Sequence, residues 1–256
     1  MWRASSPGPD EIRLLQRARE RLDLYPLAIH VNYLVNLASA DPTIRARSIG
    51  CFRGELERAA GLGAEYLVVH PGSYKGQSLE QGIAAFVLGL RDAVEGLPLR
   101  NVMVLLENTV GCGAQIGGRF EDLRAIRHCA AELTDAPVGY CLDTCHLLAA
   151  GFDVASERGL RETVRHAERV LGPDNVKLIH ANDSKTPLGS HVDRHENIGE
   201  GYIGRAAFRR ILAHPRLREK PFILETPVDN DGDDRRNVDN LKKLCPKSRT
   251  TTTRSS

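Results

Sequence analysis

The sequence has little excess charge and no long apolar run, and each shortage excludes a class of protein. Its 35 Lys and Arg residues nearly balance its 33 Asp and Glu residues, so the formal net charge is +2. Nucleic-acid binding would therefore have to depend on a local patch or on metal ions. No run approaches the roughly 20 apolar residues that span a bilayer, and the N-terminus lacks the apolar core of a secretory signal. We expect a cytoplasmic protein without membrane contact.

Cysteines are also too few and too irregularly spaced for a disulfide scaffold. We interpret the six in 256 residues as reduced thiols. Cys141 and Cys145 flank an acidic residue, and we interpret both as small buried hydrophobic side chains rather than as metal-binding thiolates. With 41% hydrophobic residues, the chain can bury the core of one large α/β domain.

Short apolar runs alternate with longer helical patterns, which is typical of βα units and a parallel sheet. The first helical pattern covers residues 11–22, with Asp10 as its expected N-cap. Six apolar runs follow, and their last residues are 36 to 45 positions apart. We therefore expect a single domain over residues 1–245 and a disordered tail over residues 246–256. The six runs end at His30, His70, Glu107, Asp143, His180 and Glu225.

These six side chains would meet on one face of the fold. In a TIM (β/α)₈-type barrel the carboxyl ends of the strands converge and carry the active site. A single His or Glu after a strand is more often a loop residue or a helix cap, but six in succession are not independent accidents. His and carboxylate groups suit zinc, manganese or iron at an open catalytic site. The pattern indicates such a barrel, with about six recognisable strands.

Three further side chains have the spacing of ligands on the same face. His146 follows Asp143 by three positions, so a helical turn there would direct both toward one cavity. Asp193 and His195 are two positions apart, and an extended segment would direct both to one side. Their segment, SHVDRHENIGEGYIG at residues 190–204, has no apolar stripe to bury. A solvated charged loop is the alternative, but its place after the His180 strand favours metal binding.

At these residues the chain resembles the endonuclease IV family of zinc-dependent apurinic/apyrimidinic endonucleases, from about Trp2 to about Pro227. The family is known for three metals in a TIM barrel of the xylose-isomerase-like class. Four motifs carry the resemblance: HPGS at 70–73, ENTVGCG at 107–113, CLDTCHLLAAGFD at 141–153 and HANDSKTPLGSHVDRHENIGEGYIG at 180–204.

The resemblance implies a ligand set of nine residues for three zinc ions, with manganese possible at some sites. His30 and His70 would hold the first ion, and Glu107 would bridge it to a second. Three side chains would complete the second site and three others the third: respectively Asp143, His180 and Glu225, and His146, Asp193 and His195.

The resemblance also implies the reaction, which is hydrolysis of the phosphodiester 5′ to an abasic site in double-stranded DNA by a monomer. The products would be a 3′-hydroxyl and a 5′-deoxyribose phosphate. Clustered metals would ionise water near neutral pH and neutralise phosphate charge, with Glu107 as the catalytic bridging carboxylate. Tyr33 and Leu34 match a segment that the family places against DNA, and packing beneath a loop is the alternative for them.

Two departures from the family pattern stand out. Cys112 occupies a position between glycines where the family usually has Gln. The family's first strand and helix, and its second strand with a basic DNA-probing segment, have no counterpart. A six-stranded barrel would leave two unpaired edges and an exposed apolar interior, and should be poorly soluble. We expect either a natural product that starts upstream of Met1 or a fragment with an open scaffold.

Two other functions fit part of the pattern. In a sugar isomerase or epimerase of the same barrel class, Glu107, Asp143, His180 and Glu225 would hold one metal. The five remaining ligands argue against it, and a count of about three zinc ions rather than one manganese or magnesium ion would separate the two. A truncated inactive relative is the other alternative, but polar ligands have no packing value once catalysis is lost.

Overall fold

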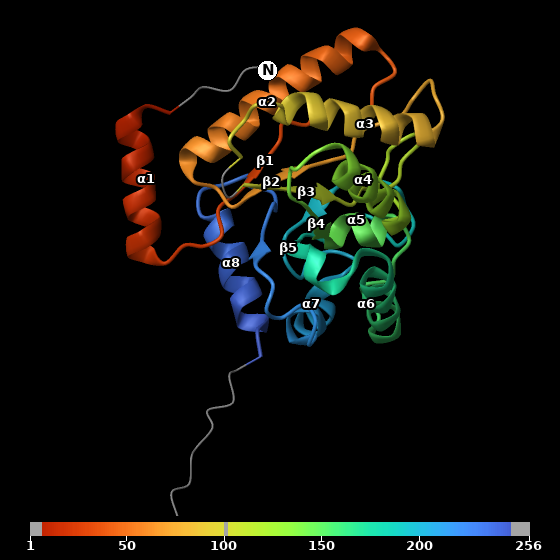
Figure 1. The fold of residues 1–256 in the computed structure, drawn as a ribbon. Helices are drawn as coiled ribbons and strands as arrows, with labels where there is room; N and C mark the ends of the chain where they lie inside the picture. Colours follow the sequence, from red (N-terminus) through yellow and green to blue (C-terminus); the bar gives the residue numbers. More distant parts are fainter. Residues whose placement is uncertain (1–6, 100–101, 247–256) are drawn as a thin grey trace, which may run out of the picture.

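A computed structural model describes residues 7–99 and 102–246, and its centre is a curled parallel sheet (Figure 1). Each of the six predicted apolar runs forms one strand, in the spatial order β1-β2-β3-β4-β5-β8. The α/β fold of the TIM-barrel class is confirmed. The strands are β1 (Ala28–His30), β2 (Tyr66–Val69), β3 (Met103–Glu107), β4 (Val138–Asp143), β5 (Val176–His180) and β8 (Phe222–Ile223).

Helices cover the outside of the sheet, and Figure 1 shows α2 to α4 on one side of the curl and α6 to α8 further round it. A separate antiparallel pair, β6 (Asp183–Ser184) and β7 (His195–Glu196), lies beyond the end of β5. The helices are α1 (Pro9–Leu22), α2 (Pro42–Leu62), α3 (Leu79–Val94), α4 (Phe120–Leu133), α5 (Thr144–Ala149), α6 (Glu157–Leu171), the 3-10 turn η1 (Pro173–Asn175), α7 (Gly204–Ala213) and α8 (Asp233–Leu244).

Alternation of side chains along the strands produces two apolar layers. One set, which includes Leu67 and Leu106, packs in the large core with residues of the helices. The other set forms a small cluster of its own because successive strand residues face opposite sides. This second cluster consists of Val68, Leu105, Cys141 and Leu178, each at most 1% exposed. The expectation of an exposed apolar interior is therefore wrong at these positions, because the four side chains from neighbouring strands pack against one another and are buried.

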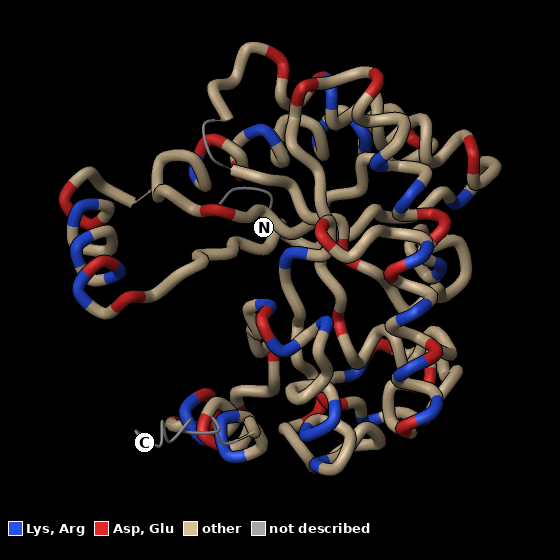
Figure 2. Tube along the Cα trace, turned by 60° about the horizontal axis from the view of Figure 1, so that its bottom comes forward, with Lys and Arg blue, Asp and Glu red and all other residues tan. Residues whose placement is uncertain are grey.

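The described part of the sheet is a partial barrel with two open edges. Among residues 7–99 and 102–246, β1 pairs only with β2, and β8 pairs only with β5. Helix α1 stands out from the sheet and packs against α2 (Figure 1). Lys and Arg alternate with Asp and Glu along the outer helices (Figure 2), in keeping with the small net charge. None of the helices described is long and apolar enough to cross a membrane.

The expected N-cap of α1 is wrong by two residues. The helix is capped by Gly8, whose N–H donates to Glu11 Oε2 at 2.7 Å. Pro9 can begin the helix because the first helical position needs no N–H donor. Asp10 therefore lies within the first turn and forms an ion pair with Arg13.

Candidate metal centre

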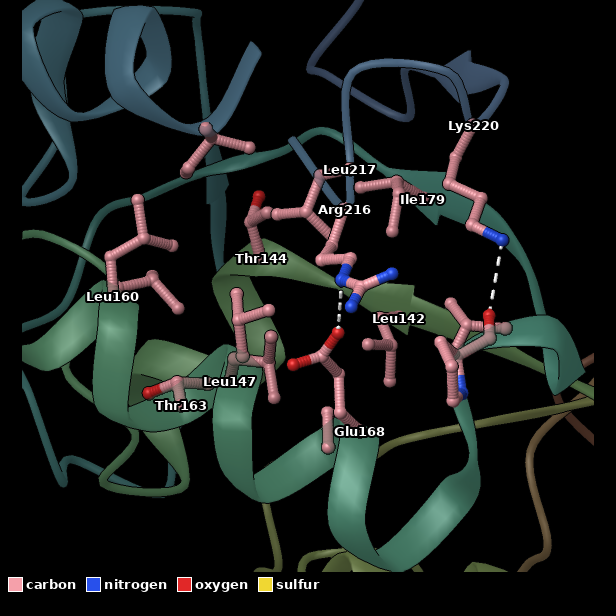
Figure 3. A pocket seen from close by; sticks show the side chains of 16 residues that line it. Leu142, Thr144, Leu147, Leu160, Thr163, Glu168, Ile179, Arg216, Leu217 and Lys220 are labelled. Atoms are coloured by element: carbon pink, nitrogen blue, oxygen red, sulfur yellow. Dashed lines mark hydrogen bonds and ion pairs between the residues drawn. The ribbon is translucent and has the colours of Figure 1, made fainter. Parts of the chain in front are cut away.

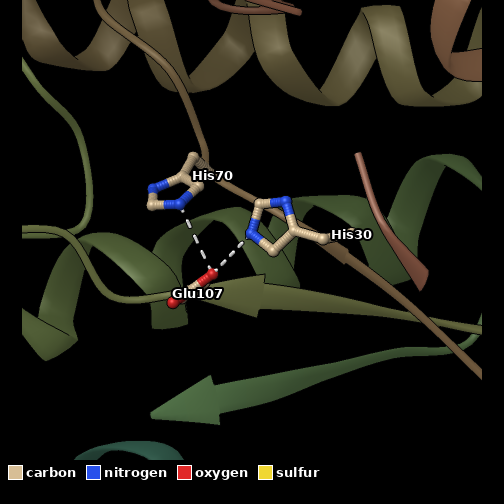
Figure 4. A group of neighbouring side chains, drawn as sticks. All are labelled: His30, His70 and Glu107. Atoms are coloured by element: carbon tan, nitrogen blue, oxygen red, sulfur yellow. Dashed lines mark hydrogen bonds and ion pairs between the residues drawn. The ribbon is translucent and has the colours of Figure 1, made fainter. Parts of the chain in front are cut away.

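Glu107, the last residue of β3, lies at the centre of the predicted site and is fully buried. Its Oε2 is 2.9 Å from Nε2 of His30 and 3.4 Å from Nε2 of His70 (Figure 4). Its Oε1 is 3.0 Å from Nδ1 of His180. The two carboxylate oxygens thus face two different groups of side chains, which is the arrangement that a bridging carboxylate requires.

The second group forms where three further strands end. The register of β4 and β5 pairs Asp143 directly with His180. Nδ1 of His180 also lies 3.2 Å from Oε2 of Glu225, which follows β8. Ligand atoms of Glu107, Asp143, His180 and Glu225 all lie within 4.8 Å of one another. The structure therefore brings together the four side chains expected to surround the second ion.

The third group comes from α5 and the segment before β7. The expected helical turn is confirmed, because Asp143 caps α5 and its side chain accepts the His146 N–H at 2.7 Å. Asp193 lies between two rings, with 3.2 Å to His146 Nε2 and 3.4 Å to His195 Nε2. The His195 side chain is only 17% exposed. This segment is therefore more than a solvated loop, although metal binding by it stays a prediction.

Two ring nitrogens in this third group fit a bound cation. Nε2 of His146 and Nε2 of His195 are buried and make no hydrogen bond of good geometry, although the Asp193 oxygens lie 3.2 and 3.4 Å from them. The other nitrogen of each ring bonds a backbone carbonyl, of Asn108 at 2.9 Å and of Glu225 at 2.9 Å respectively. Because a carbonyl can only accept, Nδ1 carries the proton, and the neutral form of each ring presents the Nε2 lone pair to the site, as in metal-binding histidines. A buried unpaired nitrogen is costly unless something binds it.

The charges of the cluster stabilise one another. Burial opposes ionisation of Glu107, but the charges of His180 and His70 and hydrogen bonds from His146 and His180 hold its pKa well below the usual range. Burial likewise opposes protonation of His146, but Asp143, Asp193 and Glu107 raise its pKa well above that of a free His. The carboxylates thus supply the negative potential that a divalent cation needs.

The two flanking cysteines are buried, as expected. Burial raises the pKa of the Cys141 thiol to about 12 and that of Cys145 to about 11. Cys145 Sγ is 3.6 Å from the carbonyl oxygen of Arg194. These shifts favour neutral thiols, but Cys141 Sγ lies within 4.8 Å of ligand atoms of Glu107 and His180, and Cys145 Sγ within 4.8 Å of those of Asp193 and His195, so a purely packing role for both stays a prediction. Cys112, the departure from the family pattern, is exposed, and its N–H donates to Gln115 Oε1 at 3.1 Å.

Tyr33 lies on the surface beside the cluster, so packing beneath a loop is the wrong interpretation for it. The side chain is 86% exposed and lines a cavity of about 350 Å³ together with His70 and Asp193. Leu34 is half-buried. An exposed aromatic ring at the rim of a polar cavity can stack on a ligand that enters it.

A second cavity lies on the outer side of β4 and β5 and is mostly apolar (Figure 3). Leu142 and Ile179 line it from the strands, and their side chains belong to the large core. Two charged lining residues, Arg216 and Glu168, pair with each other at 2.7 Å. This cavity is therefore separate from the ligand cluster and offers packing space rather than reactive groups.

The glycines of residues 199–204 surround Asp183, a residue that the sequence patterns did not single out. Asp183 is fully buried, and its carboxylate accepts the N–H groups of Gly199 at 2.9 Å, Gly201 at 3.1 Å and Ile203 at 2.9 Å. A Cβ on Gly201 would lie 2.6 Å from Asp183 Oδ1. In the sequence, Asp183 is recognisable only as an acidic residue soon after a predicted strand, and nothing there indicates that it binds the backbone of residues 199–204.

Comparison with known proteins identifies similar chains. A family described as xylose isomerase-like TIM barrel matches residues 2–246. A protein of Solibacter usitatus named probable endonuclease 4 is 68% identical over 245 residues, covering 96% of this chain and 84% of that protein. One of Chloroflexus aurantiacus with the same name is 40% identical over 250 residues, covering 95% and 85%.

Solved structures agree with these matches. The crystal structure of endonuclease IV from Thermus thermophilus is 36% identical, with a TM-score of 0.81 over 95% of this chain and 84% of that one. A D-tagatose 3-epimerase-like protein is 22% identical, with a TM-score of 0.69 over 93% and 83%. At that identity the second likeness shows a shared fold alone.

Proposed function

Because this chain belongs to the endonuclease IV family of xylose isomerase-like TIM barrels, we propose that it is a DNA-repair endonuclease that hydrolyses the phosphodiester 5′ to an abasic site. The products are a 3′-hydroxyl and a 5′-deoxyribose phosphate. One observation carries the proposal: the ligand-type side chains surround Glu107, and beside them the buried Nε2 atoms of His146 and His195 face the Asp193 carboxylate without a hydrogen bond of good geometry.

Three zinc ions are the proposed cofactors, with manganese possible at some sites. When bound, clustered zinc ions lower the pKa of water and neutralise charge on a phosphate and its leaving group. Glu107 fixes the spacing between the first group, with His30 and His70, and the second, with Asp143, His180 and Glu225. The third group consists of His146, Asp193 and His195.

Double-stranded DNA with an abasic site is the proposed substrate. An abasic nucleotide costs less to extrude than a paired one, because no base pair is lost. Tyr33, exposed beside the cavity, and the half-buried Leu34 provide the surface that contacts the unstacked DNA. We further propose that the protein acts as a monomer in the cytoplasm and that residues 1–245 form one domain. The tail at 246–256 lies outside the described residues apart from Pro246.

An incision assay tests this function. A duplex with one abasic site is incubated with the protein, with and without a chelator, and an intact duplex of the same sequence is the control. We expect cleavage of the abasic duplex alone, loss of cleavage with chelator, and about three zinc ions per chain by elemental analysis. A single bound manganese or magnesium ion together with epimerisation of a sugar would contradict the proposal.

A further inference from the structure

Asn182 is a fully buried polar residue that touches the second group of ligands. Its Oδ1 accepts the backbone N–H of Glu225 at 2.7 Å. This bond fixes which way the amide group points, since only the oxygen can accept a hydrogen bond. The amide nitrogen therefore faces away from that N–H, toward the carboxylates of the second group.

The amide nitrogen of Asn182 contacts two carboxylates at once. Nδ2 is 2.5 Å from Asp143 Oδ2 and 3.5 Å from Glu225 Oε2. The backbone of Asn182 is held as well, because its N–H donates to Thr144 Oγ1 at 3.0 Å and its carbonyl accepts the Thr144 hydroxyl at 2.7 Å. One neutral group, held on three sides, thus binds an oxygen of Asp143 closely and lies at the outer limit of hydrogen-bond distance from an oxygen of Glu225.

We propose that Asn182 is a positioning residue for the second metal site and sets the orientation of Asp143 and Glu225 before an ion binds. The inference rests on the proposed function, since that function places an ion between these carboxylates. Two carboxylates in a buried site repel each other, and a Lys or Arg between them would compete with the metal for their charge. An amide donor satisfies both without adding charge, so their affinity for a cation is kept.

Asn108 is a second buried amide near the ligands, and its contacts differ from those of Asn182. It is also buried and lies next to Glu107, but its Oδ1 accepts the Asp143 backbone N–H at 2.8 Å and its Nδ2 donates to the Asp143 carbonyl at 3.4 Å. Both bonds hold the backbone at the end of β4. Asn182, in contrast, acts on the carboxylates themselves.

Two variants of Asn182 and one matched control test the proposal. Asn182→Ala removes the amide, whereas Asn182→Asp keeps its shape and the acceptor for Glu225 N–H but replaces the donor with a charged oxygen. The control is Asn175→Ala, since Asn175 precedes β5, at the opposite end of that strand from the ligand His180, and its Nδ2 donates to the Leu171 carbonyl at 2.7 Å. All three variants lose a side-chain hydrogen bond, but only the first two lose the donor to the ligands.

Zinc binding to the purified full chain is measured by competition with a chromophoric chelator, and Co²⁺-substituted protein gives the visible spectrum of the site. Both Asn182 variants should bind one zinc ion about 10- to 100-fold more weakly and show a changed Co²⁺ spectrum, while Asn175→Ala keeps both properties of the parent. Parent-like affinity and spectrum in either Asn182 variant would overturn the inference, as would an equal loss in Asn175→Ala. If the parent chain itself binds no metal and cuts no abasic duplex, the proposed function fails instead.

Discussion

At the scale of single residues, the position of Glu107 predicts the most severe loss of function. Its two oxygens face His30 and His180 separately, so both groups depend on its charge. Glu107→Gln keeps the shape but removes the bridging charge, and we expect incision of an abasic duplex to fall by at least about a hundredfold. The rate is measured at saturating zinc, with circular dichroism as the control for folding. Activity within a few fold of the parent would remove Glu107 from the mechanism.

Tyr33 predicts a different phenotype, because its ring is exposed at the rim of the cavity rather than packed against the central carboxylate. Tyr33→Ala should weaken preference for abasic over intact duplex by about tenfold, since stacking on one base contributes about 1 to 3 kcal/mol. Binding of the two duplexes is compared at one salt concentration, and zinc content serves as the control. Loss of zinc along with the preference would instead assign Tyr33 to the support of the metal site.

At the scale of elements, Asp183 holds the turn that follows β7. Asp183→Asn keeps the size but sets an NH₂ group against backbone donors, which leaves N–H groups of the 199–204 turn unpaired at about 1 to 3 kcal/mol. We expect about one zinc equivalent to be lost, because Asp183 lies in β6, which pairs with β7, and β7 carries His195; His195→Ala should lose the same equivalent. Elemental analysis measures the loss.

A matched control for this prediction lies in the first turn of α8. Asp233 is also a buried carboxylate, and it accepts the N–H groups of Asp229 at 3.1 Å and Asn230 at 2.9 Å. Asp233→Asn should lower thermal stability but leave zinc content unchanged. Equal zinc loss in both variants would mean that the effect of Asp183 is general destabilisation.

Elements also differ in how far the sequence predicted them. The six strands were predictable because each belongs to a short apolar run that ends in a ligand-type residue, and the turn at His146 followed from its spacing to Asp143. The N-cap of α1 was not predictable. Asp10 and Gly8 are both acceptable caps, and the bond from Gly8 N–H to the Glu11 side chain selects Gly8. Asp183 and Asn182 act on partners 16 to 43 positions away, and no local pattern shows such a pairing.

At the scale of the whole molecule, metal removal should lower stability. Without an ion the nine side chains form a polar cluster inside the fold, and a ligand that binds only the folded state stabilises it by about 2.7 kcal/mol at a hundredfold excess over Kd. We expect a chelator to lower the melting temperature by at least about 5 °C. Scanning fluorimetry measures it, and chelator already saturated with zinc is the control. An unchanged melting temperature would contradict metal binding by the cluster.

The rings of His146 and His195 are bonded to the backbone carbonyls of Asn108 and Glu225, so each ring spans two segments of the chain. An ion that immobilises the rings also immobilises those segments, including the end of β8, which is an open edge in the described sheet. Amide hydrogen exchange at the end of an edge strand normally reports local fraying. Exchange near Glu225 should therefore slow when zinc binds, so the opening rate of an edge strand becomes a measure of occupancy of the metal site.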